Sequence, residues 1–422
     1  MAKPKIALVP SAQGSKFYSV LPSSGVGDFD FTRSGSATRI NSQGLIETVG
    51  NGVSRLNYPM IDGKVVGCPH HILEPTRTNL ITYSEDFSQS YWTKDGLSII
   101  SNQVISPDGT LNADKLIEGT NSGIHKIVKP YTGISGTNTC SIFVKPNGVT
   151  KIGITSTESV SVLSSFDLSN GTLISSLSDD YSITPFPNGW FRISSTDIGG
   201  NRKMAVFLLN DTGNYSYQGD GVSGVYIYGA MLEQGSYPTS YIPTNGSSVT
   251  RSAETATGSG DASTFNDSEG VLMAEISALD DDNTNRFISL SSGQYQNRVA
   301  IFFDATNNNI NVQIRSNDVN QPIVGEFNNY NIKEFNKILI KYKKNDVDIY
   351  INGFLLSHNT NCNMAVGLSE IAFDDGGGLS DLYGNTKQVQ YFDTTLTNSE
   401  LETLTSWVSF QDMAEGQLYT IE

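Results

Sequence analysis

Four aspartates in two short loops are the side chains of this sequence best suited to hold a metal ion. Asp280 and Asp282 stand in the run DDDN, and Asp374 and Asp375 stand in DDGGG. Calcium takes oxygen ligands, which loops supply as carboxylates and backbone carbonyls. We therefore regard these four residues as candidate ligands of a structural calcium ion and expect no other cofactor. The alternative is that both loops are solvated acidic turns.

A cysteine and two histidines form the second cluster that could bind metal. Cys68, His70 and His71 lie in the run CPHH. A structural zinc site needs four ligands, and adjacent histidines rarely converge on one ion. The sequence therefore favours ordinary loop residues at this position over a zinc site.

Aromatic side chains in predicted loops could bind sugars, because a flat ring stacks on a sugar face while neighbouring Asn and Asp side chains bind hydroxyls. The predicted carbohydrate-binding residues are Tyr91, Trp92, Tyr131, Tyr215 and Tyr217. The alternative is that these rings pack between subunits. Trp190 lies on a predicted strand instead, so we expect it in the core.

Catalytic motifs are missing from the sequence. Glycoside hydrolysis needs a pair of carboxylates, and acyl transfer needs a nucleophile with its base. The nearest approach to a glycosidase pattern, Glu370 with Asp374 and Asp375, has the wrong spacing and lacks a second Glu. We therefore expect no enzyme activity.

Composition and charge limit the partners. The chain has 422 residues, 43 acidic and 27 basic side chains, and a net charge of −16. Such a surface repels nucleic acid and anionic membranes, whereas sugars bind without needing net charge. The apolar run Ile6 to Val9 is too short for a signal peptide, and no window predicts a bilayer span. Cys68, Cys140 and Cys362 indicate no disulfide framework, which fits synthesis in a reducing cytoplasm.

The elements that must position these residues are short strands between turns. Abundant Gly, Ser, Thr and Asn, with many Tyr and Phe, are typical of an all-β protein. We expect a loop-rich N-terminal segment with short strands over residues 1–72. A jelly-roll-like β-sandwich follows over residues 73–252, with turns such as Ser169-Asn170-Gly171 between its strands.

A small, polar segment over residues 253–267 predicts a linker, followed by a second β-sandwich over residues 268–422. Its clearest hairpin pairs 337–343 with 346–352, where Ile338, Ile340 and Tyr342 should share one face. Thr397 and Glu400 form a capping-box pattern, which predicts one short C-terminal helix. Because the linker offers few core residues, we expect the two sandwiches to fold separately.

Residues 28–87 resemble a segment found in many bacteriophage tail and fibre proteins. The matching stretches are FTRSGSATRI (31–40), GLIETV (44–49), RLNY (55–58), Leu73-Glu74 and RTNLITYSEDF (77–87). The resemblance implies that this segment attaches to the virion or to sister chains.

Two further resemblances cover the rest of the chain. The stretches SIFVK (141–145), NGWFR (188–192) and YGAMLE (228–233) are similar to a carbohydrate-binding-module-like domain of phage proteins. The pattern VDIYING (347–353), followed by LTNSEL (396–401), resembles the concanavalin A/laminin-G-like fold. The latter match concerns the fold and says little about a ligand.

Together these patterns predict a bacteriophage virion structural protein, a tail fibre or spike that recognises host-surface glycans. The expected partners are host cell-surface polysaccharide and other virion proteins, with a homotrimer favoured over a pentamer and no nucleic acid or membrane insertion. The protein would lie on the virion surface after synthesis in the host cytoplasm. Two alternatives stay open: a polysaccharide depolymerase with an unrecognised site, and a purely architectural capsid decoration protein. The sequence names neither the glycan nor the place on the virion.

Overall fold

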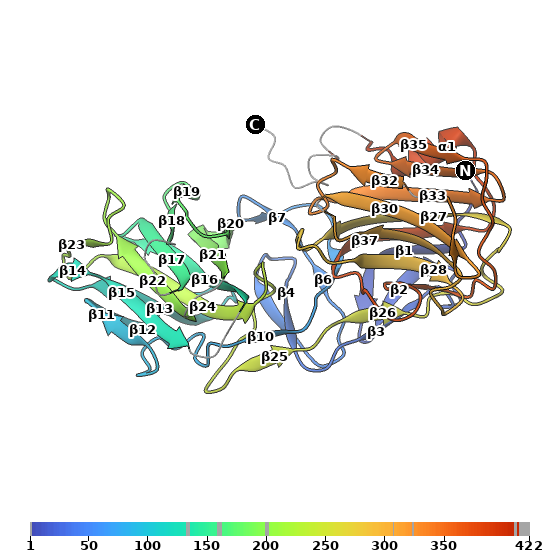
Figure 1. Cartoon of the computed structure of the whole chain (residues 1–422). Coiled ribbons are helices and arrows are strands. Elements are labelled where there is room, and N and C mark those ends of the chain that lie inside the picture. Colours follow the sequence, from blue (N-terminus) through green and yellow to red (C-terminus); the bar gives the residue numbers. More distant parts are fainter. Residues whose placement is uncertain are drawn as a thin grey trace.

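The chain folds into two β-sandwiches, and one is inserted into the other. The computed structural model describes residues 2–131, 136–157, 163–198, 202–306, 308–322, 325–408 and residue 412. Figure 1 shows the inserted sandwich as the cyan and green lobe, and the other lobe combines the blue N-terminal strands with the orange and red C-terminal ones. The predicted all-β class, with a short helix near the C-terminus, is confirmed. No described helix has the length and hydropathy needed to cross a membrane.

The inserted sandwich packs two six-stranded antiparallel sheets face to face. The strands of one sheet, in spatial order, are β11 (Thr93–Asp95), β15 (Lys126–Tyr131), β22 (Arg202–Leu209), β17 (Lys151–Thr157), β18 (Ser164–Asp167) and β19 (Thr172–Ser175). Those of the other are β12 (Leu97–Ile105), β13 (Leu111–Glu118), β24 (Gly224–Gln234), β16 (Thr137–Asn147), β21 (Trp190–Ile198) and β20 (Asp180–Phe186). Its core lies between the sheets and includes Ile142, Ile154 and Val206.

The second sandwich is built from both ends of the chain. Its large sheet runs in the order β26 (Thr255–Thr257), β3 (Phe29–Thr32), β2 (Lys16–Leu21), β1 (Ile6–Gln13), β37 (Gly384–Phe392), β27 (Glu269–Ala278), β33 (Asn336–Lys343), β34 (Val347–Ile351) and β35 (Phe354–Asn359). Strand β9 (His70–Leu73) also pairs with β37, and β6 (Leu56–Asn57) pairs with β9. The facing sheet contains β31 (Val319–Asn320), β30 (Asn309–Ser316), β29 (Arg298–Phe303), β28 (Arg286–Ser291), β36 (Glu370–Ala372) and β32 (Gly325–Asn328).

Smaller elements complete the fold. Four two-stranded sheets pair β10 (Arg77–Asn79) with β25 (Val249–Arg251), β14 (Ser122–Ile124) with β23 (Ser216–Gln218), β4 (Ala37–Ile40) with β5 (Ile46–Val49), and β7 (Met60–Ile61) with β8 (Lys64–Val65). Helix α1 (Asn398–Thr405) begins at the predicted capping box, where the Thr397 side chain accepts a hydrogen bond from the Glu400 amide. Leu401 of this helix packs on Leu339, whereas Ile338 and Ile340 face the other sheet, as the period of two predicts.

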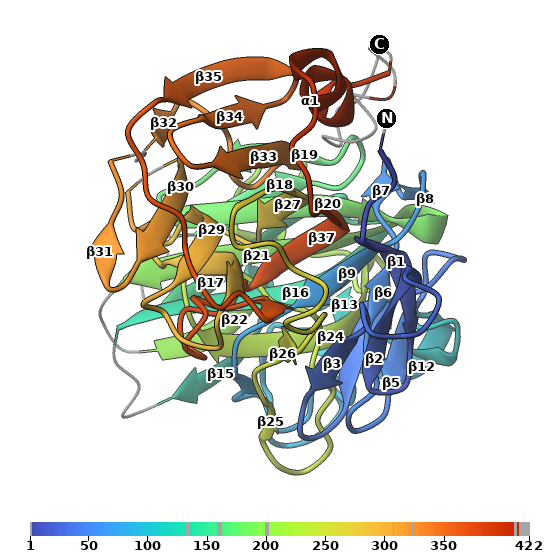
Figure 2. The same cartoon turned by 90° about the vertical axis from the view of Figure 1, so that its right-hand side faces the viewer.

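The N-terminal segment differs from our expectation of a separate unit over residues 1–72. Strand β1 pairs with β37 through the register Ile6↔Tyr391, and Figure 2 shows the two strands adjacent. Phe17 and Phe29 pack on Phe373 with ring centroids 6.2 and 5.0 Å apart, inside the core of the second sandwich. The physical reason is that these apolar strands find their partners within the same chain.

The expected linker over residues 253–267 is also corrected. Strand β26 pairs with β3 through Ala256↔Phe31, and Phe265 packs edge-on against Tyr391 at 5.0 Å. The segment is polar in composition, but its apolar side chains Ala256 and Phe265 are buried. The inserted sandwich is therefore connected to the second sandwich through the paired strands β10 and β25. These strands form a stem between the lobes, with Arg77 opposite Arg251.

A buried ionic cluster lies at the base of this stem. Arg55 Nη2 forms an ion pair with Glu74 Oε2 at 2.8 Å, and Arg55 Nε donates to Glu254 Oε1 at 2.9 Å. Arg33 Nη1 contacts Glu254 Oε1 at 2.7 Å, and Arg251 Nη1 contacts Glu74 Oε2 at 2.9 Å. All five side chains are buried, with at most 4% of any residue exposed. Three of these residues, Arg33, Arg55 and Glu74, lie within residues 28–87, so this segment contributes to the junction between the two lobes.

Candidate functional site

The structure separates the five predicted carbohydrate-binding aromatics and buries one of them. Trp92 is only 2% exposed, packs on Phe87 at 5.2 Å, and donates from Nε1 to the Tyr83 carbonyl at 3.1 Å. The prediction of a sugar-stacking role for Trp92 is therefore wrong, because its ring fills the core beneath the loop. Trp190 is 1% exposed, so its predicted core position is confirmed.

The four tyrosines lie in two separate groups. Tyr91 and Tyr131 are half-buried and share a hydrogen bond between their hydroxyls, and Tyr131 also donates to the Leu80 carbonyl at 2.8 Å. Tyr217 donates to Glu118 Oε2 at 2.6 Å, and burial raises the pKa of its phenol. Tyr215 alone is exposed, at 38%, with its ring edge-on to Phe207 at 6.3 Å.

The four candidate calcium ligands are already paired with protein groups. Asp282 accepts from Arg286 Nη2 at 2.5 Å, and Asp280 accepts from Ser236 Oγ at 3.2 Å and lies 3.4 Å from Lys333 Nζ.

In the second loop, Asp374 accepts from the Gly376 amide at 2.6 Å and Asp375 from the Gly377 amide at 2.9 Å. Burial raises the pKa of Asp374. Among the described residues, neither loop brings three Asp, Glu, His or Cys ligand atoms together. A calcium site at either loop would therefore need backbone carbonyls to complete its ligands.

The CPHH run is split between surface and core. Cys68 is exposed, whereas His70 and His71 are buried on strand β9. Burial lowers the pKa of His70 to about 3 and that of His71 to about 4, so both rings are neutral at pH 7. His71 stacks on Phe17 at 3.9 Å and contacts the Val9 carbonyl through Nε2 at 3.3 Å. His71 thus packs against the N-terminal strands β1 and β2.

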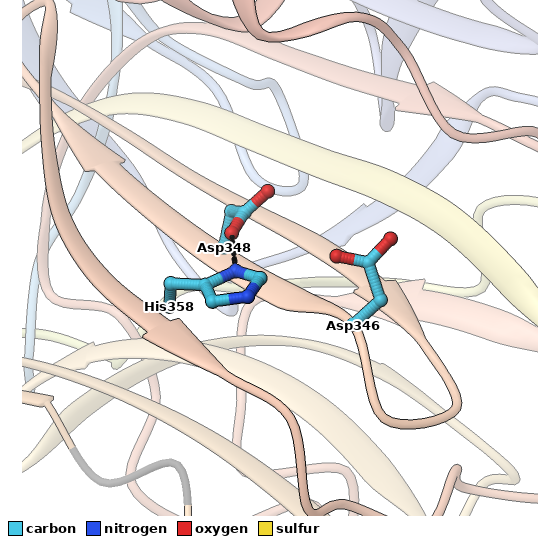
Figure 3. A group of neighbouring side chains, drawn as sticks. All are labelled: Asp346, Asp348 and His358. Carbon is cyan, nitrogen blue, oxygen red and sulfur yellow. Dashed lines mark hydrogen bonds and ion pairs between the residues drawn. The ribbon is translucent and has the colours of Figure 1, made fainter.

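Asp346, Asp348 and His358 form the one three-residue cluster of potential metal ligands within the described chain (Figure 3). His358 Nδ1 lies 2.5 Å from Asp348 Oδ1. Lys341 Nζ lies 2.7 Å from Asp346 Oδ1 and 2.5 Å from Asp348 Oδ2, so an ammonium group already occupies the space between the carboxylates. The cluster is therefore a partly buried ion-pair network centred on Lys341 and Asp348.

A polar cleft of about 470 Å³ opens on the inserted sandwich, close to the stem. Its walls combine one aromatic ring with carboxylates, amides and hydroxyls. The lining residues are Tyr83, Glu85, Asp86, Ser88, Ser101, Asn102, Asn112, Asp114, Thr244 and Asn245. This mixture of a ring with closely spaced donors and acceptors suits a ligand rich in hydroxyl groups.

Beside the cleft, hydrogen bonds join residues 79–84, which precede the sandwich, to residues 242–244, which follow it. Ser84 Oγ accepts from the Thr244 amide at 2.8 Å, and Asn79 Nδ2 donates to the Ile242 carbonyl at 2.8 Å. Asp114 accepts from the Phe87 and Asn102 amides, each at 3.0 Å, which fixes the loop at residue 102. Asn102 has φ 57, a left-handed conformation that Asn tolerates better than most residues.

Carboxylates in the cleft have contrasting electrostatic environments. Burial raises the pKa of Glu85, even though Tyr241 and Tyr228 donate to its Oε1 at 2.9 and 3.1 Å. Burial also raises the pKa of Asp114. Burial favours the neutral form of Asp86 as well, but hydrogen bonds from Ser88 and Gln89 outweigh it and lower its pKa. The cleft thus holds fixed acceptors of different basicity.

Sequence reasoning missed this cleft. Tyr83, Glu85 and Asp86 stand in the stretch TYSEDF, which the phage-like block includes, but nothing local showed that residues 101–114 and 244–245 would join them. The available signal was the resemblance of residues 77–87, because this matched stretch contains Tyr83, Glu85 and Asp86.

Comparisons with known proteins identify no family for this chain. No known family matches it, and no curated protein matches it. Among solved structures, a sialidase carbohydrate-binding module of Ruminococcus gnavus bound to α2,3-sialyllactose shares 14% identity over 34% of this chain and 86% of its own, at a TM-score of 0.27. Domain 4 of an arabinanase from Geobacillus stearothermophilus, in complex with arabinotriose, shares 11% identity over 36% of this chain and 73% of its own, at a TM-score of 0.30.

Laminin domains give a similar result. Domains LG4-5 of the mouse laminin α1 chain share 10% identity over 64% of this chain and 86% of their own, at a TM-score of 0.22. At scores this low, none of these matches assigns a function to the chain.

Proposed function

We propose that the protein is a non-catalytic glycan-binding component of a bacteriophage virion, and that the polar cleft at Tyr83 is its glycan site. The observation that carries the glycan assignment is the composition of this cleft. A half-buried tyrosine ring stands beside the exposed amides of Asn102 and Asn245, with carboxylates behind them. A sugar offers an apolar ring face for stacking and hydroxyls that both donate and accept.

The charge of the cleft narrows the class of glycan. Glu85, Asp86 and Asp114 line it, and no basic side chain does. A carboxylate-bearing sugar would meet like charge here, whereas neutral and amino sugars would donate hydroxyl or amine protons to these acceptors. We therefore expect neutral or amino sugars, bound weakly at one site and more strongly when many copies act together.

A glycan array with two tyrosine variants tests the site. Tyr83→Ala should reduce array binding at least tenfold, which is about 1.4 kcal/mol, while the melting temperature stays close to that of the wild type. Tyr215→Ala removes an exposed ring of the same sandwich outside the cleft and serves as the matched control. Binding lost with Tyr215→Ala or Tyr217→Ala, and kept with Tyr83→Ala, would move the site to the 216–218 hairpin. An array without any bound glycan would favour the architectural alternative.

The virion assignment is supported by the resemblance of residues 28–87 to phage tail and fibre proteins. The N-terminal strands also leave the apolar side chains of Tyr18 and Val20 39% and 55% exposed, which suits contact with another virion protein. We propose a tail fibre or spike on the virion surface, made in the host cytoplasm and assembled as a homotrimer, with a pentamer as the alternative. Antibody labelling of virions and light scattering of the purified chain test the location and the copy number.

Glycoside hydrolysis is the second candidate function, because the pKa of Glu85 is raised and that of Asp86 is lowered within one polar cleft. Such a contrast suits a general acid and a base. However, the Glu85 Oε1 atom is held by two tyrosine hydroxyls, and Asp86 is held by Ser88 and Gln89. These bonds favour binding over proton transfer. Release of reducing ends from a bound polysaccharide, abolished by Glu85→Gln, would establish the hydrolase instead.

A further inference from the structure

A second cleft lies between the two lobes and shares no lining residue with the cleft at Tyr83. It has a volume of about 320 Å³, at the lower end of the range for small-ligand pockets. Both lobes contribute walls. Thr184 and Arg192 come from the inserted sandwich, Tyr58 comes from the N-terminal segment, and Leu279 and Asn385 come from the second sandwich.

Arg192 is the unusual group in this cleft. Its Nη2 donates to the Thr239 carbonyl at 2.7 Å and to Ser141 Oγ at 3.0 Å, both neutral acceptors. Among the described residues no carboxylate lies within 4.0 Å of its guanidinium, and its buried Nε has no hydrogen-bond partner. Arginines are ordinarily paired with a carboxylate in direct contact, so a guanidinium that lines a cleft without such a contact is a position that can accept an anion.

The buried carboxylates of Glu233 and Glu74 act on Arg192 from beyond contact distance, but the cleft lining itself carries two arginines, Arg39 and Arg192, and one carboxylate, Glu74. The carboxylate of Glu74 also lines the cleft, but it is bound by Arg55 and Arg251 and by the Ser240 amide at 2.7 Å. Arg39 adds a second cation, and Glu47 pairs with it at 2.8 Å. In a chain of net charge −16, the cleft thus presents a local positive site.

The rest of the lining suits a sugar ring. Tyr58 is half-buried, and Pro59 and Met60 continue the apolar wall. Thr184, which lies directly opposite Arg192 in the β20–β21 register, offers an exposed hydroxyl, and Asn57 offers an amide. An aromatic face with hydroxyl-binding groups binds a saccharide, and a guanidinium binds a carboxylate through charge-assisted hydrogen bonds.

We propose that the interlobe cleft is a second ligand site, which binds a carboxylate-bearing sugar with its carboxylate on Arg192 and its ring against Tyr58. The charge of this site is opposite to that of the cleft at Tyr83, so the two sites select different sugars. The proposal stands on Arg192 and its surroundings and does not depend on glycan binding at Tyr83.

Calorimetric titration of the full chain with a galacturonate trisaccharide and with the matching galactose trisaccharide tests this site. The wild type should bind the galacturonate form at least tenfold more tightly, and this preference should weaken as salt is raised. Arg192→Gln should abolish the preference. Arg315→Gln, which removes a half-buried arginine of the second sandwich, should keep it, and Tyr83→Ala should keep it too.

A second variant, at an exposed position, tests the site independently in case Arg192→Gln does not fold. Thr184→Trp adds a ring at an exposed position that lines the cleft, and it should block galacturonate binding without changing the melting temperature. Equal binding of both trisaccharides by the wild type would overturn the proposal, as would a preference that survives in both variants. Displacement of the galacturonate by an equal concentration of inorganic phosphate would show a general anion site and would overturn the assignment to a sugar.

Discussion

At the scale of single residues, the ionic cluster around Arg55 gives a structural role to Arg33, Arg55 and Glu74 of the segment 28–87. Arg55 is fully buried, yet its guanidinium reaches both Glu74 and Glu254. Burial alone would raise the pKa of Glu74, but Arg251 and Arg55 outweigh burial and lower it to about 2. The carboxylate therefore stays ionised, and the cluster joins segments that lie far apart in the sequence.

Removing one carboxylate from the cluster should be costly. Glu254→Gln leaves Arg33 and Arg55 buried beside a single glutamate, and we expect the free energy of unfolding to fall by about 3–5 kcal/mol. The matched control is Glu47→Gln, which breaks the partly exposed pair with Arg39 and should cost less than about 1 kcal/mol. Urea denaturation of both variants measures the difference. Equal small losses would mean that the cluster does not hold the lobes together.

Buried His71 should make the stability fall as the pH falls. Its folded pKa of about 4 lies below the ordinary value of 6.5, so folding favours the neutral ring. The stabilisation is complete above pH 6.5 and is lost as the pH falls from 6.5 toward 4, by about 1.4 kcal/mol per pH unit.

The variant His71→Phe keeps a ring against Phe17 but cannot take up a proton. Denaturation between pH 6.5 and 5, above the range in which Glu74 titrates, should show a shallower slope for this variant than for the wild type. Identical slopes would show that His71 does not titrate on unfolding.

Individual residues were predictable where local pattern decides their environment. Trp190 follows a Pro-Asn-Gly turn on an apolar strand, and it is in the core. Trp92 and Tyr91 stand in an equally turn-rich stretch, yet only Trp92 is buried, because the direction of a loop side chain depends on what packs beneath it. Arg55 and Glu254 were unpredictable as partners, since 199 residues separate them and no local period connects them.

At the scale of elements, hairpins and the helix cap followed from short-range rules. The β33–β34 hairpin pairs Ile340 with Ile349, as alternation and the intervening turn suggested. By contrast, the pairing of β1 with β37 joins opposite ends of the sequence, and the alternation of side chains along a strand does not identify its partner. Our expectation of a self-contained second sandwich failed for this reason.

Fragments should follow the inserted topology. Residues 76–252 contain both sheets of the inserted sandwich and the stem strands, and we expect them to melt cooperatively alone. Residues 268–422 lack β1 to β3, β9 and β26, so their core would lose Phe17, Phe29 and Phe31 and should not fold. A chain that joins residues 1–75 to 253–422 by a short glycine linker restores these strands and should fold. Circular dichroism and thermal melts of the three fragments measure which of them fold. A cooperative transition for residues 268–422 alone would contradict the inserted arrangement.

At the scale of the whole molecule, the insertion divides the chain into two lobes. The second sandwich holds the N-terminal strands, and the stem presents the inserted sandwich as a distinct lobe (Figure 1). The cleft at Tyr83 lies on that lobe, beside the hydrogen bonds that join residues 79–84 to residues 242–244. Such a division suits a protein that attaches at one end and binds ligand at the other.

Hydrogen–deuterium exchange of the full chain, with and without a glycan selected on the array, tests the glycan site most directly. We predict increased protection in residues 83–88, 101–114 and 244–246, which line the cleft or connect its lining residues. The same glycan should give no such protection in Tyr83→Ala. Protection confined to residues 214–218 or to the second sandwich would contradict the account, and so would a bound glycan that leaves the exchange of all three cleft segments unchanged.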